Sequence, residues 1–68
     1  MMAKIQLNGK KRVIKDKMRL FELISKLKLN NKKIAIELNG KIISKTIYKK
    51  CILKNKDKIE IVHFIGGG

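Results

Sequence analysis

Two Asn-Gly dipeptides, at residues 8–9 and 39–40, place the most specific constraint on how this 68-residue chain can fold. In each case apolar and polar residues alternate in the segment just before the dipeptide, over residues 4–8 and 34–38. Alternation is typical of a strand with one buried face, and Asn-Gly is a strong hairpin signal because both residues tolerate positive φ. The sequence therefore predicts two β-hairpins. The first returns over residues 11–15, with Val13 or Ile14 facing inward, and the second returns from Lys41.

A helix is predicted between the two hairpins, over residues 19–28. Its apolar residues recur at helical spacing: Leu20, Leu23, Ile24 and Leu27. Arg19 is a weak residue for the N-cap, because it offers no side-chain acceptor to the first turn. We expect Asn30 and Asn31 to end the helix, since asparagine accepts left-handed backbone geometry.

The last third of the chain predicts short elements followed by one longer strand. Residues 44–53 suggest a helical turn and a brief strand that close the core, and residues 54–57 form a polar turn. The final strand covers residues 58–65 and has apolar residues on both faces towards its end. This pattern indicates a central strand with one side partly exposed.

The predicted order is strand, strand, helix, strand, short elements, strand. One helix covers only one face of a sheet, and pairing of the last strand with the first places the last strand in the middle. The sequence therefore predicts an α+β chain with the β-grasp (ubiquitin-like) fold. A mixed sheet of four to five strands packs on one main helix, residues 1–65 form the domain, and residues 66–68 form a flexible tail.

The tail consists of Gly66, Gly67 and Gly68, and the α-carboxylate of Gly68 follows. Glycine lets a backbone approach a surface closely, and three extended residues reach about 10 Å. Such a tail fits a narrow channel and presents its carboxylate to an enzyme. Our hypothesis is that this carboxylate is the reactive group, and the alternative is an unstructured end without a role.

The net charge of +13 invites a nucleic-acid interpretation. However, the lysines are scattered along the chain and only two cations are arginine, the usual residue for bidentate phosphate contacts. No aromatic residues interleave with the lysines to stack on bases. We therefore expect a solvated basic surface, and a small basic module that binds RNA or an acidic partner remains the alternative.

A single cysteine, Cys51, excludes an internal disulfide and lacks the partners of a metal site, so we expect a buried structural thiol. The N-terminus has no apolar region of a signal peptide, and no apolar run is long enough to cross a membrane. These features lead us to expect a cytoplasmic protein.

The residues beside the tail predict binding rather than catalysis. His63 has no nearby nucleophile or acid pattern and is expected to be a structural strand residue. Val62, Phe64 and Ile65 are candidate docking residues for a partner, since an exposed aromatic side chain is a typical anchor. Paired catalytic acids, phosphate-binding loops and metal-ligand clusters are absent from the sequence. We therefore expect a protein that binds no metal or cofactor and serves as the substrate of an enzyme rather than as an enzyme.

Three stretches together resemble the bacterial ThiS family of sulfur carriers: residues 4–9, 34–40 and 59–68. The likeness covers essentially the full chain, and the mid-chain Glu-Leu-Asn-Gly and the terminal Glu-Ile-Val with glycines carry it jointly. The small subunit of molybdopterin synthase is the second candidate, because it also has a β-grasp fold and a terminal Gly-Gly.

The resemblance implies a mechanism and a set of partners. A ThiF-like adenylyltransferase uses ATP and magnesium to adenylate the carboxylate of Gly68. A persulfide supplied through a cysteine desulfurase then replaces AMP and leaves a thiocarboxylate. The ThiG thiazole synthase accepts the sulfur during thiazole formation in thiamine biosynthesis.

Some positions depart from this family's pattern. ThiS chains commonly have a glycine and a Ser or Thr before the helix, where this chain has Lys17 and Arg19. They also commonly have Gly-Asp before the last strand, where this chain has Lys56-Asp57. The missing cap is expected to cost about 1 kcal/mol of helix stability.

Overall fold

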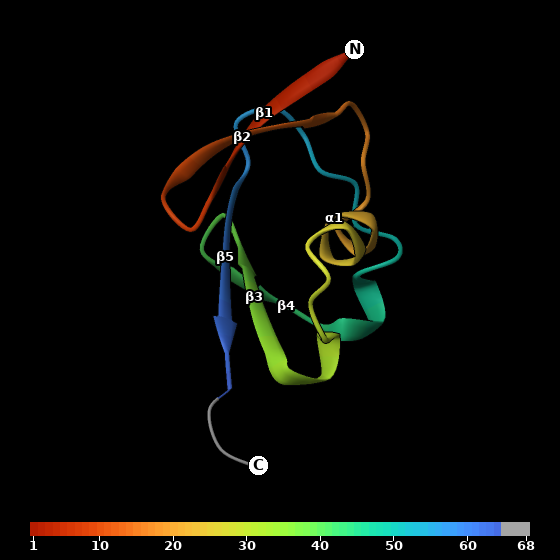
Figure 1. Ribbon diagram of the computed structural model, residues 1–68, viewed down its shortest axis with the longest axis vertical. Helices are drawn as coiled ribbons and strands as arrows, with labels where there is room; N and C mark the ends of the chain where they lie inside the picture. Colours follow the sequence, from red (N-terminus) through yellow and green to blue (C-terminus); the bar gives the residue numbers. More distant parts are fainter. Residues whose placement is uncertain (65–68) are drawn as a thin grey trace.

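The computed structural model describes residues 1–64 and contains five strands, one α-helix and two 3-10 helices (Figure 1). The elements are β1 (Met2–Leu7), β2 (Lys10–Lys15), α1 (Leu20–Lys26), η1 (Asn31–Lys33), β3 (Ile34–Leu38), β4 (Lys41–Ile43), η2 (Lys45–Ile47) and β5 (Lys58–His63). The predicted element order is confirmed.

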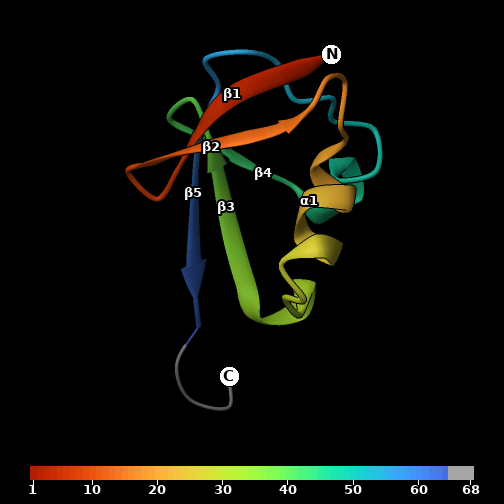
Figure 2. The same ribbon diagram turned by 45° about the horizontal axis from the view of Figure 1, so that its top comes forward.

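The strands form one mixed sheet in the order β2-β1-β5-β3-β4. β5 runs parallel to β1 and antiparallel to β3, and the two hairpins are antiparallel. The last strand therefore lies in the centre, as predicted. Helix α1 covers one face of the sheet, and no described element covers the opposite face, which is called the open face below (Figures 1 and 2).

The core lies between α1 and the covered face of the sheet. Its buried side chains come from every strand but β4, from the helix, from Met18 in the connection before the helix, and from Tyr48 and Leu53 in the segment that follows η2. The open choice in β2 is decided, because Ile14 is buried and Val13 is exposed. Since β2 pairs with β1 in a fixed register, Ile14 lies opposite the buried Ala3.

Both Asn-Gly turns have the predicted backbone conformation. φ is +49° at Asn8 and +82° at Gly9, and it is +53° at Asn39 and +86° at Gly40. Positive φ at both central residues is characteristic of the type I′ hairpin turn. A Cβ atom added at either glycine would meet nothing within 4 Å, so these glycines are required by φ rather than by space.

The helix begins as predicted but ends differently. The carboxylate of Glu22 accepts a hydrogen bond from the Arg19 backbone N–H at 3.2 Å, which is half of a capping box and partly offsets the weak cap. At the other end the left-handed residue is Lys28, with φ of +57°, and Asn30 is extended with φ of −88°. The expected asparagine stop is therefore wrong. Asn30 instead caps η1, where its side chain accepts from the Lys32 N–H at 2.9 Å.

Two further lysines adopt the conformation that favours glycine. φ is +62° at Lys17 and +73° at Lys56, the two positions at which the family resemblance leads one to expect glycine. A side chain in this region carries a steric cost, because Cβ approaches the following carbonyl oxygen. The fold thus keeps the turn geometry without the residue that best suits it.

The predicted turn and brief strand after β4 are also found. η2 supplies the turn, and an isolated bridge joins Ile52 to Arg19. Cys51 lies beside this bridge and is only half-buried, packed against the core. Burial raises the pKa of the Cys51 thiol above its ordinary value, the nearby charge of Asp57 raises it further, and Lys54 opposes the shift.

Within residues 1–64, no helix has the length and apolar character needed to span a membrane.

Candidate functional site

The end of β5 carries the described part of the predicted docking surface. Ile59 and Ile61 point into the core, whereas Val62 and Phe64 are 58% and 54% exposed. The two exposed side chains lie two residues apart, and residues at this spacing in a strand share a face. The predictions for Ile65, Gly66, Gly67 and Gly68 lie outside the described residues. The docking role of Val62 and Phe64 stays a prediction.

β5 is held unequally by its two neighbours. On the β3 side five residue pairs run from Ile59 to His63, and the Phe64 N–H donates to the Lys33 carbonyl at 2.8 Å. On the β1 side only Lys58 and Ile59 have strand partners. Among the described residues, the last residues of β5 therefore pair with a neighbouring strand on the β3 side alone, and Figure 2 shows β5 running past β1 beside β3.

The asparagine side chains of both turns fix the position of β5. Asn8 Oδ1 accepts from the Ile61 N–H at 2.7 Å, and Asn39 Oδ1 accepts from the Lys58 N–H at 2.8 Å. These two bonds hold the strand from opposite sides and at different points along it. The segment that leads to the tail is thus positioned by residues far away in the sequence.

Asp57, placed by the sequence in a polar turn, is in fact buried at 7% exposure. Its carboxylate accepts from the Lys54 N–H at 2.7 Å and from Asn39 Nδ2 at 3.0 Å. A buried carboxylate needs such donors, because an unpaired buried acceptor is costly. The Asp57 side chain therefore closes the turn before β5 and links that turn to the second hairpin.

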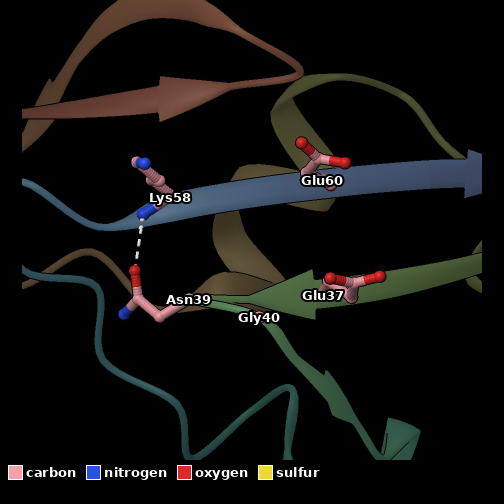
Figure 3. A pocket seen from close by; sticks show the side chains of 5 residues that line it. All are labelled: Glu37, Asn39, Gly40, Lys58 and Glu60. Atoms are coloured by element: carbon pink, nitrogen blue, oxygen red, sulfur yellow. Dashed lines mark hydrogen bonds between the residues drawn. The ribbon is translucent and has the colours of Figure 1, made fainter.

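A hollow on the open face of the sheet brings two carboxylates together (Figure 3). Glu37 of β3 and Glu60 of β5 are direct cross-strand partners, and both are exposed. The hollow has a volume of about 450 Å³, and its described lining is Glu37, Asn39, Gly40, Lys58 and Glu60. Lys58 is the one cation in this set, and its side chain extends away from the two carboxylates in Figure 3.

This acidic pair was missed by the sequence reasoning. Like charges directly opposite one another destabilise a sheet slightly. Because the chain has only five acidic residues, a facing pair among them is unexpected. Next to the pair lies Ile42 of β4, the partner of Glu37, which is 76% exposed. Alternation places Glu37 and Glu60 on polar faces, but only the register of β3 on β5 puts them opposite each other. The open face thus combines exposed apolar side chains with two carboxylates.

The described residues offer binding features rather than a metal-ligand set. Within residues 1–64, no group of three or more His, Cys, Asp or Glu side chains is placed to hold a metal ion. On the open face of β3, β4 and β5, the hollow lies towards the start of β5, and the exposed Val62 and Phe64 lie towards its end. A surface of this kind suits contact with another macromolecule.

Sheet order, the single covering helix and the central last strand define a β-grasp protein of the ubiquitin-like class, as predicted. The crystal structure of the thiamine biosynthesis protein ThiS from Geobacter metallireducens matches with a TM-score of 0.83 and 28% sequence identity, over 96% of this chain and 99% of that one. The likeness therefore extends to the whole fold.

Sequence comparison narrows the class. The model of the ThiS family matches residues 5–68. The sulfur carrier protein ThiS of Bacillus subtilis is 43% identical over 65 residues, covering 94% of this chain and 98% of that relative. The thiazole synthase of Paramagnetospirillum magneticum is 37% identical over 65 residues, but the chain spans only 20% of its length. The chain belongs to the ThiS family.

Proposed function

We propose that this chain is a sulfur carrier of thiamine biosynthesis, and that the carboxylate of Gly68 becomes a thiocarboxylate. The observation that carries the proposal is the family match, which continues through the terminal glycines to Gly68. The name of the Bacillus subtilis relative, which this chain covers almost completely, supports it. The anchoring of β5 by Asn8 and Asn39 gives the tail a fixed base.

The chemistry follows from the nature of a carboxylate. A carboxylate is a poor electrophile, so a carboxylate oxygen of Gly68 first attacks the α-phosphate of ATP and pyrophosphate leaves. The terminal sulfur of a persulfide then attacks the acyl carbon and displaces AMP. Cleavage of the resulting acyl disulfide by a second thiol leaves the thiocarboxylate, a nucleophilic sulfur that is tethered to the protein. Magnesium and ATP belong to the activating enzyme in this scheme.

The chain's own contribution is presentation rather than catalysis. Gly66 and Gly67 remove steric bulk next to the reacting carbonyl and fit a narrow channel. Val62 and Phe64, with Ile65, form the apolar contact that docks the carrier on its partners. Ile42 lies on the same open face and extends this contact.

The proposed partners are a ThiF-like adenylyltransferase, a cysteine desulfurase that supplies the persulfide, and the ThiG thiazole synthase. Two relatives named thiazole synthase contain a segment similar to 96% of this chain, which supports an association with that enzyme. The acceptor distinguishes this scheme from a molybdopterin-type carrier: the sulfur goes to a thiazole precursor.

The direct test is intact-mass spectrometry after incubation with a ThiF-like enzyme, ATP, magnesium and a persulfide donor. We expect the protein mass to rise by the difference between sulfur and oxygen, and we expect no rise in a variant that lacks Gly67 and Gly68. An unchanged mass of the wild-type chain, with an enzyme that adenylates another carrier, contradicts the proposal. The nucleic-acid alternative would be favoured if the wild-type chain and the shortened variant bound RNA equally well and neither gained sulfur.

A further inference from the structure

Within the described residues, β1 pairs with only the first part of the β5 edge that faces it. β1 pairs with β5 through Gln6 with Lys58 and Leu7 with Ile59, after which the chain turns away at Asn8. β5 continues to His63 and stays paired with β3 over this length. Figures 1 and 2 both show the lower half of β5 with β3 on one side and no described strand on the other.

The alternation of hydrogen bonds identifies the backbone groups at this edge. The backbone N–H and C=O groups of even-numbered residues in β5 point towards β3, since the Lys58 carbonyl accepts from the Asn39 N–H and the Phe64 N–H donates to the Lys33 carbonyl. The backbone groups of odd-numbered residues point towards β1, since the Ile59 carbonyl accepts from the Asn8 N–H at 2.9 Å. The Ile61 carbonyl and both backbone groups of His63 therefore lie on the β1 side, beyond the last residue of β1.

Asn8 marks the point at which strand pairing stops. Its side chain accepts from the Ile61 N–H at 2.7 Å, where a continuing strand would have supplied a carbonyl. This hydrogen bond satisfies one backbone group of the edge with a side chain. Within residues 1–64, no hydrogen bond is found for the next three backbone groups in sequence, the Ile61 carbonyl and the N–H and carbonyl of His63. Those groups alternate acceptor, donor and acceptor, and an extended backbone can form hydrogen bonds with groups in this order.

We propose that the β1-facing edge of β5 at residues 61–63 is a strand-addition site, at which an extended segment of the activating enzyme pairs with the carrier. This inference rests on the function proposed above and names how the partner is recognised. The site is short, because the turn at Asn8-Gly9 bounds it at one end. Main-chain hydrogen bonds supply the register, and the exposed Val62 and Phe64 lie beside the incoming strand.

Two observations favour an enzyme segment over a second copy of this chain. Each copy carries a net charge of +13, so pairing of two copies brings like charges together. The edge also lies close to the reacting group along the chain. His63 precedes Gly68 by five residues, which span at most about 18 Å of extended backbone. A strand bound at His63 therefore fixes how far the carboxylate can reach into the enzyme.

The test uses His63→Pro in the full chain, because proline removes the N–H that points to the free edge and none that points to β3. His63→Ala is the matched control, since it removes the imidazole and keeps the N–H. Binding to the ThiF-like enzyme is measured by titration, and sulfur loading at saturating enzyme is measured by intact mass. We expect His63→Pro to weaken binding about tenfold and His63→Ala less than twofold.

Amide hydrogen exchange of the wild-type chain provides a second readout that needs no variant to fold. We expect the His63 amide to exchange more slowly in the enzyme complex than in the free protein. Equal binding of His63→Pro and wild type, or an unchanged His63 amide, overturns the proposal. Protection of His63 that appears without enzyme and grows with protein concentration assigns the edge to a second copy and also overturns it.

The two proposals fail in different ways. If the wild-type chain gains no sulfur, the carrier function fails. If it gains sulfur and the binding of His63→Pro is undiminished, the carrier function stands and the strand-addition site is wrong.

Discussion

The two Asn-Gly turns are alike in sequence and in backbone conformation, but their side chains have different tasks. The Asn8 side chain makes one hydrogen bond, with the Ile61 N–H of β5. The Asn39 side chain makes two, with the Lys58 N–H and with the buried carboxylate of Asp57. The first turn thus ends a strand pairing, and the second holds a buried charge in place. A dipeptide that specifies a turn does not specify what its side chain binds.

The largest effect is expected from Asn39→Gly. Glycine keeps the positive φ, so the change removes the side-chain bonds and leaves Asp57 with one fewer donor. Because the carboxylate is buried, we expect a loss of about 2–3 kcal/mol in the free energy of unfolding. Urea denaturation measures this loss. An effect equal to that of the same change at Asn8 would contradict the distinction between the turns.

Asn8→Gly is the matched change in the first turn. It removes the one side-chain bond to the Ile61 N–H, which is part-buried but involves no charged group, and we expect a loss of about 1 kcal/mol. The Ile61 amide should also exchange faster with solvent, which hydrogen exchange measures. Unchanged exchange of this amide would mean that Asn8 does not protect it.

Lys17 and Lys56 also have positive φ but differ from the two asparagines, because no side-chain hydrogen bond is found for either lysine in residues 1–64. Relief of a left-handed side chain contributes about 1–2 kcal/mol, and the greater freedom of glycine in the unfolded chain offsets about 0.5–1 kcal/mol of it. We expect Lys17→Gly and Lys56→Gly each to stabilise the fold by about 0.5–1 kcal/mol in thermal or urea unfolding. Lys49→Gly, at a residue without positive φ, serves as the control and should not stabilise.

The smallest expected effect is on the reactivity of the Cys51 thiol, whose pKa is raised in part by the nearby charge of Asp57. Burial raises the pKa of this thiol and Asp57 raises it further, so the reactive thiolate forms at higher pH in the folded chain than in the unfolded chain. We expect a thiol reagent at pH 8 to react more slowly with the native protein than with the protein in urea, and the difference to shrink as pH rises. Asp57→Asn should speed the native reaction severalfold at most, since burial is the larger cause. Equal rates in the two states would show that the thiol is not shielded.

Much of the fold was predictable because its signals are local. The alternation before Asn8 and Asn39 gave the hairpins, and the spacing of Leu20, Leu23 and Ile24 gave the helix. Asn30 was misjudged because the chain requires its left-handed residue directly after Leu27, where only Lys28 is available. Asp57 was misjudged because its burial depends on Asn39, a residue 18 positions away.

The candidate site divides in the same way. The exposed positions of Val62 and Phe64 follow from the period of a strand and were anticipated. The facing of Glu37 and Glu60 was not, since it depends on which residues of β3 and β5 become neighbours. The incomplete pairing of β5 with β1 depends likewise on where β1 ends relative to its partner.

By itself the sequence determined the elements, the two turn types and the glycines that follow the last strand, because each depends on a few consecutive residues. Only the tertiary structure decided which backbone group each asparagine binds, which carboxylates meet and which edge of β5 lacks a strand partner within residues 1–64. These features join residues as much as 53 positions apart, so they are set by the register between strands and not by any local pattern.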